Sequence, residues 1–247
     1  MSGHSHWATI RRKKGAADAK KGQIFTRLAR EIVLAAREGG GDPETNVRLA
    51  LAIDRARAQN MPKDNIERAI KRGTGESKEG GALEQIFYEG YAPHGVALMI
   101  ETVTDNRNRA VADIRHTLTR HGGSMADAGS VSWQFNRVAS FTFPLGNHDP
   151  DAIFELAVEA GADDVIIDDE VEIIGPIESF KSISESLRAA KIQPEEAGMR
   201  MMPTNEIELS DEDTLQVLKL VETLEELDDI QNVYHNMKVS DAVWAQL

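Results

Sequence analysis

The residues best suited to binding chemistry lie near the N-terminus, where an aromatic side chain precedes a run of cations. Trp7 stands four positions before the run Arg11, Arg12, Lys13 and Lys14. Cations in a run bind phosphates, because each phosphate contact releases condensed counterions. An indole beside them can stack on an unpaired base or pack the segment against its own protein, and the sequence leaves both roles open. The run predicts a contact with nucleic acid.

Further cations follow at helical spacing and extend this basic surface. One set lies on a helix expected over residues 18–38, largely opposite its apolar stripe. A second set occupies the later turns of a helix expected after Pro62, where cations also suit the helix dipole. We expect both sets to bind phosphates together with the N-terminal run. These residues are Lys20, Lys21, Arg27, Arg30, Arg37, Arg68, Lys71 and Arg72.

A second candidate site is the segment 104–109, between an expected strand and an expected helix. Asp105 or Asn106 can cap this helix, whose free N–H groups favour an anion. Arg107 and Arg109 can add charge-assisted hydrogen bonds to a phosphate. The same side chains can instead form local salt bridges in an ordinary polar turn. Both interpretations stay open here, and Arg107 and Arg109 are candidate nucleic-acid contacts.

No arrangement of residues predicts catalysis. The seven histidines show neither the H-E-x-x-H nor the H-x-x-x-H spacing of a metal-binding helix. The chain lacks a G-x-S-x-G elbow, a P-loop and a G-x-G-x-x-G turn after a strand. It contains no cysteine, which excludes disulfides, thiolate metal sites and cysteine nucleophiles. We therefore expect no enzyme activity, no catalytic residues, no metal and no cofactor.

Two short motifs have metal-binding alternatives. Ser2-Gly3-His4 would offer an amine, two amides and an imidazole to Cu(II) if Met1 were removed. Asp168-Asp169-Glu170 has carboxylates for a divalent cation, although the motif is more typical of a solvated hairpin turn. The hairpin turn is therefore the preferred interpretation of the acidic motif.

The N-terminal candidates belong to a helical region that a linker separates from the rest. Gly39-Gly40-Gly41 ends the first expected helix, and Asp42-Pro43 reads as the N-cap and first position of the second. The third helix ends near Gly73, and a polar, glycine-rich linker covers residues 74–81. The sequence predicts a small all-helical bundle behind a basic arm.

After the linker, strands alternate with helices, and the order suggests one unit nested in another. Residues 140–202 follow the order β-α-β-β-α-β, the split βαβ pattern of ferredoxin-like folds. Segments on either side repeat that order, with strands at 96–103, 130–135, 205–209 and 231–236 and helices at 108–120 and 215–227. A simple tandem is the alternative topology.

The expected fold class is therefore α+β, with a basic helical bundle followed by two ferredoxin-like domains, the second inserted in the first. The expected domains are residues 1–77, residues 78–135 plus 204–247, and residues 136–203. The glycine-rich linker makes motion of the helical domain relative to the others plausible.

Charge is divided sharply along the chain. Residues 1–75 carry a net charge of +8 and residues 76–247 carry −21, within a total of −13. The acidic part repels a polyanion, so the N-terminal end is the one expected to touch nucleic acid. No apolar run is long enough to span a membrane, and the lack of cysteine fits a reducing compartment. We expect a cytoplasmic protein with no membrane partner and no small-molecule substrate.

Six motifs follow one another along the chain: Gly3–Ala8, Asp18–Phe25, Met61–Ile70, Tyr88–Tyr91, Thr104–Arg109 and Gly129–Val131. Together they resemble the YebC/PmpR family, over essentially the whole chain. The chain departs from the usual family pattern at His6, where lysine is common, in the turn 92–95 and in the loop 124–128. The resemblance implies three domains, no enzyme activity and no required cofactor.

The resemblance implies two nucleic-acid functions. Bacterial members are described as probable transcriptional regulators, which implies a DNA-binding protein that works with the transcription machinery. Other members are linked to the ribosome and to relief of stalling, which implies a factor that binds ribosomal or transfer RNA and probes a functional centre with its basic arm or its Gly122–Gly129 loop. We take the transcriptional regulator as the expected function and the translation factor as the alternative.

Two features of the residues bear on this choice. No segment reads as a helix-turn-helix recognition helix, which together with Trp7 slightly favours RNA. The strongly acidic part of the chain also allows a third interpretation, a protein-interaction scaffold that binds no nucleic acid.

Overall fold

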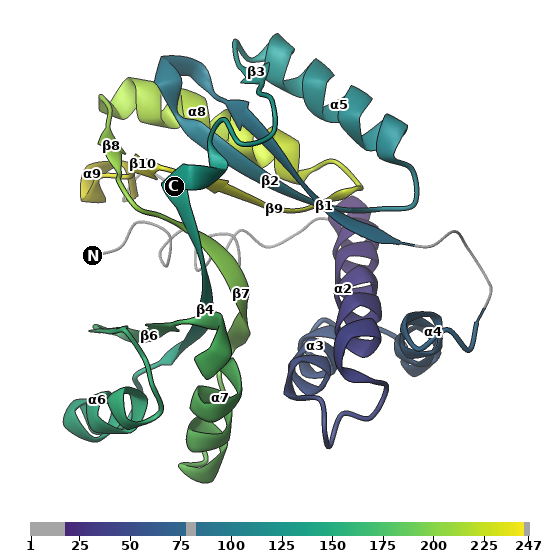
Figure 1. Ribbon diagram of the computed structural model, residues 1–247, viewed down its shortest axis with the longest axis vertical. Coiled ribbons are helices and arrows are strands. Elements are labelled where there is room, and N and C mark those ends of the chain that lie inside the picture. The colour runs from purple at the N-terminus through teal and green to yellow at the C-terminus, as the bar shows by residue number, and fades with distance from the viewer. Residues whose placement is uncertain (1–17, 78–82, 245–247) are drawn as a thin grey trace. The chain divides into compact units, whose positions relative to one another are not determined.

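The computed structural model describes residues 18–77 and 83–244 (Figure 1). Contacts divide these residues into two units, and each is described by itself. The first unit comprises residues 28–77 and 137–200, and the second comprises residues 18–27, 83–136 and 201–244. Across the described part of the chain, no helix combines the length and the apolarity needed to cross a membrane.

The described chain opens with the three helices that the sequence predicts, α2 (Asp18–Gly39), α3 (Val47–Ala58) and α4 (Lys63–Gly73). Their apolar side chains are buried because each helix carries one apolar face. Buried members of these faces are Ile32, Val33, Leu34, Leu49, Ile53, Ile66 and Ala69.

Helix α3 begins later than the expected start at Asp42. Its N-cap is Asn46, whose Oδ1 accepts a hydrogen bond of 3.0 Å from the backbone N–H of Leu49. The Asn46 amide also donates to the carbonyl oxygens of Ala35 and Gly40, both at 2.8 Å. Asn46 is therefore the N-cap in place of Asp42. Its buried side chain caps the helix and also satisfies two backbone carbonyls, whereas the Asp42 side chain only closes a turn.

The second unit is built on a four-stranded sheet in the order β3-β1-β2-β9. Strand β1 (Glu84–Tyr91) pairs antiparallel with β2 (Ala97–Thr104), and β2 pairs antiparallel with β9 (Ile230–His235). The edge strand β3 (Ser124–Met125) is short. Two two-residue strands, β8 (Ile207–Glu208) and β10 (Met237–Lys238), pair with each other outside this sheet, and α9 (Asp241–Trp244) follows.

One face of this sheet carries the core of the second unit. Helices α5 (Arg107–Arg120) and α8 (Asp211–Glu225) pack there, as Figure 1 shows above the strands. Burial of these apolar side chains supplies about 25 cal/mol for each Å² removed from water. Fully buried contributors are Leu98, Ile100, Ile114, Leu118, Val217 and Val221.

Three strand assignments in this unit differ from the sequence prediction. The expected strand at 130–135 is wrong, because residues 132–134 form a 3₁₀ turn and the N–H groups of Val131 and Ser132 donate to the Glu89 carboxylate. The expected strand at 205–209 shrinks to β8 and does not join the main sheet. The sequence does not predict β1, because two glutamates and a glycine interrupt the apolar alternation of this strand.

The first unit contains a second four-stranded sheet, in the order β5-β6-β4-β7. Strand β6 (Glu170–Gly175) pairs antiparallel with both β4 (Phe135–Pro144) and β5 (Asp164–Ile167), and β7 (Glu196–Pro203) is the last strand. Its two helices, α6 (Pro150–Glu159) and α7 (Phe180–Ala189), complete the strand-helix-strand-strand-helix-strand order.

The core of the first unit lies between this sheet and the helices α6 and α7. The acidic motif Asp168-Asp169-Glu170 lies at the turn between β5 and β6. Asp168 and Asp169 join β5 to β6 as a tight hairpin turn, in agreement with the preferred interpretation of that motif. No group of three or more potential metal ligands occurs in residues 18–77 or 83–244. Fully buried core residues are Phe141, Phe143, Ile173, Ile183 and Leu187.

Candidate nucleic-acid interface

Part of the candidate interface lies outside the residues that the structure describes. The backbone of Lys20 and Lys21 belongs to the first turn of α2, and their side chains are not described. The Ser2-Gly3-His4 motif lies outside the described residues as well. So do the candidate contacts Trp7, Arg11, Arg12, Lys13 and Lys14.

Arg27 on α2 has a structural partner. Its guanidinium donates to the backbone carbonyl oxygen of Gln231 on β9, and one turn earlier the Gln23 amide donates to the carbonyl oxygen of Glu226 at 3.0 Å. Both contacts tie the start of α2 to the second unit. The Arg27 guanidinium therefore has a role in the fold as well as being a candidate nucleic-acid contact.

In the first unit, α2 and α4 meet close to their C-terminal ends. A Cβ placed on Gly73 would lie 2.5 Å from the carbonyl oxygen of Val33 and 2.7 Å from Cβ of Ala36. Only glycine allows this approach, because any side chain would overlap the α2 backbone. The packing brings the last turn of α4 next to the segment of α2 that leads into Arg37.

The cations near this helix contact differ in exposure. Arg37 and Lys71 are exposed, whereas Arg30 and Arg72 are half-buried. Arg68 is exposed and bonds locally, with its guanidinium donating to the side chain of Asn65. Arg37 follows the turn of α2 that Gly73 contacts, and Lys71 and Arg72 precede Gly73 in the last turn of α4.

Arg109 does not have the free guanidinium that a phosphate contact requires. Its Nε and Nη2 each donate to an oxygen of Asp229 at 2.8 Å, and Nη2 also donates to Asp105 at 3.0 Å. The Asp229 side chain is only 4% exposed. Its hydrogen bonds and charge, helped by Asp105, raise the pKa of Arg109. Paired carboxylate and guanidinium in this bidentate form make a strong local interaction.

The rest of this segment is also satisfied internally. Arg107 forms an ion pair with Glu84, and Asn106 caps α5 by accepting from the backbone N–H of Arg109 at 3.1 Å. The helix start is therefore occupied by its own side chain rather than open to an anion. These contacts favour the local salt-bridge interpretation for Arg107 and Arg109.

A buried glutamate in β1 organises the loop that follows β3. The Glu89 carboxylate accepts hydrogen bonds from the backbone N–H groups of Gly129 at 2.7 Å, Val131 at 2.6 Å and Ser132 at 3.0 Å. Burial by itself would raise the pKa of Glu89, but these N–H donors outweigh it and lower the pKa below its ordinary value. Glu89 belongs to the Tyr88–Tyr91 motif that carries the family resemblance, but the sequence does not indicate that its carboxylate binds this loop.

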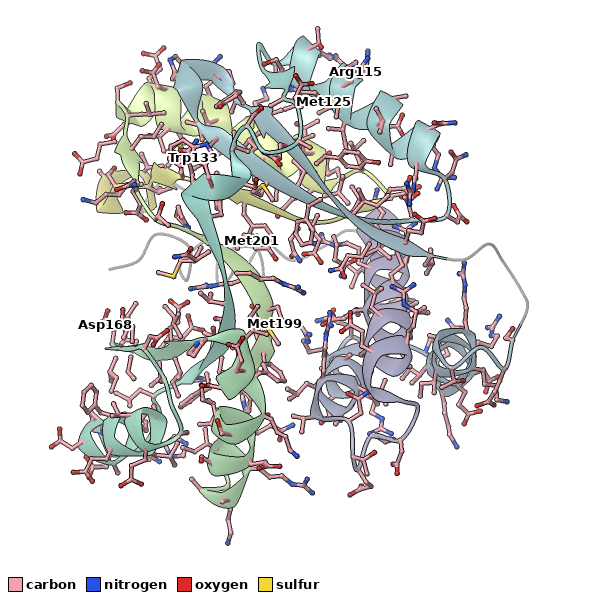
Figure 2. All side chains as sticks on the ribbon, in the orientation of Figure 1. Arg115, Met125, Trp133, Asp168, Met199 and Met201 are labelled. Atoms are coloured by element: carbon pink, nitrogen blue, oxygen red, sulfur yellow. The ribbon has the colours of Figure 1, made fainter. Side chains whose placement is uncertain are left out.

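The same loop displays an aromatic side chain. Trp133 is 69% exposed, and its indole N–H donates to the carbonyl oxygen of Ser130 at 2.9 Å. Figure 2 shows Trp133 on the segment that leads into β4. Because the N–H is already bonded, the ring offers an apolar face without an unmet polar group.

Comparison with known proteins identifies relatives over the full length. A family model described as the TACO1/YebC N-terminal domain matches residues 5–76, and the model of the second and third TACO1/YebC domains matches residues 83–237. A "Probable transcriptional regulatory protein" of Chlorobaculum parvum is 51% identical, and the alignment covers 100% of this chain and 99% of that protein. One of the same description from Acidithiobacillus ferrooxidans is 52% identical over 100% of this chain and 98% of that protein.

A solved structure shows the same fold. The crystal structure of a conserved hypothetical protein from Aquifex aeolicus has a TM-score of 0.81 and 41% sequence identity. The match covers 91% of this chain and 93% of that one. Together with the two family models, these matches show that the chain is a member of the TACO1/YebC family.

Proposed function

We propose that the chain is a DNA-binding transcriptional regulator without enzyme activity. Its basic N-terminal region contacts the nucleic acid through Trp7 and binds phosphates through Arg11, Arg12, Lys13 and Lys14. The helices α2 and α4 extend this contact through Lys20, Lys21, Arg30, Arg37, Arg68, Lys71 and Arg72. Arg27 belongs to the same proposed contact, beside its hydrogen bond to the backbone of Gln231.

The observation that carries the proposal is the separation of charge. A net charge of +8 on residues 1–75 beside −21 on the remainder restricts polyanion binding to one end of the chain. The printed names of the full-length relatives support a regulatory role. The meeting of α2 and α4 at Gly73 adds a structural reason for their cations to act together.

The test is the salt dependence of binding to a short duplex DNA of mixed sequence. The quadruple variant Arg11→Ala, Arg12→Ala, Lys13→Ala and Lys14→Ala should lower the slope of log K against log[salt] by roughly 3 to 4, at about 0.9 for each lost phosphate contact. The matched control removes four cations from the acidic region through Lys181→Ala, Arg188→Ala, Lys191→Ala and Lys219→Ala, and should keep the wild-type slope.

The same proteins distinguish the alternative functions. Sedimentation of cell lysate through a sucrose gradient would favour a translation factor if the wild type moved with ribosomes, the quadruple variant did not, and duplex DNA were bound poorly. Equal nucleic-acid affinity for wild type and quadruple variant would contradict both nucleic-acid functions and favour a protein-interaction scaffold.

A further inference from the structure

We infer that the exposed side of α6, in the first unit, is a docking surface for a positively charged segment of another protein. The surface consists of the apolar side chains Phe154 and Val158 together with the carboxylates of Asp151, Glu155 and Glu159. The segment that fits it carries Lys or Arg around an apolar side chain. The inference goes beyond the proposed function, because it concerns a protein partner and not the nucleic acid.

The first observation is that α6 exposes two large apolar side chains. Phe154 is 52% exposed and Val158 is 50% exposed. On the α-helices that the structure describes, no other large apolar side chain is as exposed as these two. Residues four positions apart on a helix are neighbours on the same face, so Phe154 and Val158 form one continuous strip.

The core of the first unit does not need this strip. Helix α6 packs against its sheet through the buried side chains of Ile153 and Ala157. Phe154 and Val158 each follow one of these residues and therefore point about 100° away from it around the helix, at 3.6 residues per turn. Helices α6 and α7 lie side by side on one face of the sheet (Figure 1). An aromatic side chain left in water beside a complete core is typical of a protein interface.

The second observation is the charge around the strip. Residues 149–180 contain 11 Asp and Glu and no Lys, Arg or His. Within residues 18–77 and 83–244, none of the three carboxylates of the α6 surface forms an ion pair. On the neighbouring helix α7, Lys181 pairs with Glu185. Arg188 of the same helix pairs with Glu44 instead. The negative charge of the α6 surface is therefore not cancelled by its packing neighbour.

This charge selects the class of occupant. A nucleic-acid backbone or an anionic membrane is repelled by it. A second copy that presented its own α6 would bring like charges together, which costs binding energy. A cationic protein segment gains from the same carboxylates, which also steer its approach, while Phe154 and Val158 bury its apolar side chain.

The strip also has a purely local explanation. An apolar pair four residues apart stabilises the helix that carries it. That role would change the unfolding of the protein without changing the binding of a partner, so the two roles have different readouts.

The experiment measures binding of a short fluorescein-labelled synthetic helix, with Leu on one face and Lys on the other, by anisotropy at several salt concentrations and without nucleic acid. Phe154→Ala/Val158→Ala keeps the charge of the surface, and we expect it to bind the peptide at least about tenfold more weakly than wild type, because apolar burial is lost. Asp151→Asn/Glu155→Gln/Glu159→Gln should bind more weakly at low salt and show a flatter salt dependence.

Two control proteins and one control peptide accompany these variants. Trp133→Ala removes the exposed apolar side chain outside α6 and should bind the peptide as wild type does. Glu178→Gln/Glu206→Gln/Glu212→Gln neutralises three exposed acids outside α6 and should stay close to wild type. A peptide with Ser in place of Leu should bind wild type more weakly, which tests the apolar contact even if the alanine variant unfolds.

Three outcomes would overturn the inference. Equal affinity of wild type and Phe154→Ala/Val158→Ala, with no loss for the Ser peptide, would show only a general attraction to an acidic chain. Equally tight binding of a peptide with Glu in place of Lys would contradict the charge selection. Self-association of wild type in sedimentation velocity that Phe154→Ala/Val158→Ala abolishes would assign the surface to a second copy. None of these results bears on DNA binding, so the proposed function is tested separately.

Discussion

At the scale of single residues, the clearest determinant is a carboxylate rather than a cation. Glu89 is 8% exposed and holds three backbone N–H groups of the loop that carries Trp133. Hydrogen bonds to a charged acceptor contribute about 1.5 to 3 kcal/mol each, so this one side chain stabilises the loop strongly. An exposed aromatic on an ordered loop loses little entropy when it meets a partner.

We predict that Glu89→Gln loosens this loop. A glutamine amide has one acceptor oxygen without full charge, so it cannot replace a carboxylate that bonds three donors. Amide hydrogen exchange at residues 129–132 should accelerate by at least about tenfold, which corresponds to 1.4 kcal/mol of local stability. Glu84→Gln on the same strand is the control and should leave these amides unchanged. Unchanged exchange in Glu89→Gln would show that the loop is held by its other contacts.

The pH dependence of this loop follows from the direction of the Glu89 shift. The pKa of Glu89 is lowered from its ordinary value of 4.5 in the folded protein. Its contribution to stability is therefore complete above pH 4.5 and is lost as the pH falls through the lower folded value.

At the scale of elements, α5 illustrates how position along one helix changes what a cation does. Arg109 in its first turn is bound to a buried carboxylate, whereas Arg115 and Arg120 in its later turns are not. The first turn lies beside Asp229, which directly precedes β9. This end of the helix therefore serves the fold.

We predict that Asp229→Asn destabilises the protein through α5. The substitution removes the negative charge from two hydrogen bonds at 2.8 Å and should cost about 2 kcal/mol, because bonds to charged groups contribute more than neutral ones. The midpoint of urea unfolding measures this cost. Arg107→Gln, which breaks an exposed pair with Glu84, should cost less than about 1 kcal/mol.

A different result for Asp229→Asn would change the assignment of Arg109. Unaltered stability together with tighter binding to duplex DNA would show that the released guanidinium is available to phosphate. The segment 104–109 would then return to the interface as the sequence first suggested.

At the scale of the whole molecule, a buried histidine links stability to pH. His235 is 1% exposed, its Nδ1 accepts from the backbone N–H of Met237 at 3.3 Å, and burial lowers its pKa to about 4. In the unfolded chain the His235 imidazole binds a proton below pH 6.5. In the folded protein the same imidazole stays neutral until about pH 4. Stability must therefore fall as the pH drops through this window.

We predict that wild type loses about 2 kcal/mol more stability than His235→Asn between pH 7 and pH 5. This value follows from about 1.4 kcal/mol for each pH unit below 6.5. Urea unfolding at the two pH values measures it, and comparing differences removes any uniform destabilisation by the variant. Equal losses in wild type and His235→Asn would show that other groups control acid unfolding.

The domain boundaries at residues 77, 135 and 203 and the insertion of one ferredoxin-like domain in the other remain predictions. The sheet orders β3-β1-β2-β9 and β5-β6-β4-β7 are compatible with two four-stranded units. Separate expression of residues 136–203, followed by a cooperative unfolding transition, is the direct measurement for the inner domain.

The sequence by itself determined the family, the three N-terminal helices and the separation of charge. These features depend on ordered motifs, on apolar periodicity within one segment and on composition, all of which are local. Helix α4 is an example, because its apolar spacing and its terminal Gly73 mark it without any knowledge of its neighbours.

Only the tertiary structure decided the roles of Glu89, Arg109 and Asn46. Arg109 bonds to Asp229, 120 positions away, and Glu89 bonds to N–H groups about 40 positions away. Strand β1 also depends on its partner, because Glu84–Tyr91 lacks a clear alternation and is stabilised by its register with β2. The physical reason is that the energy of a polar side chain is set by the group it meets, and distant segments meet only after the chain has folded.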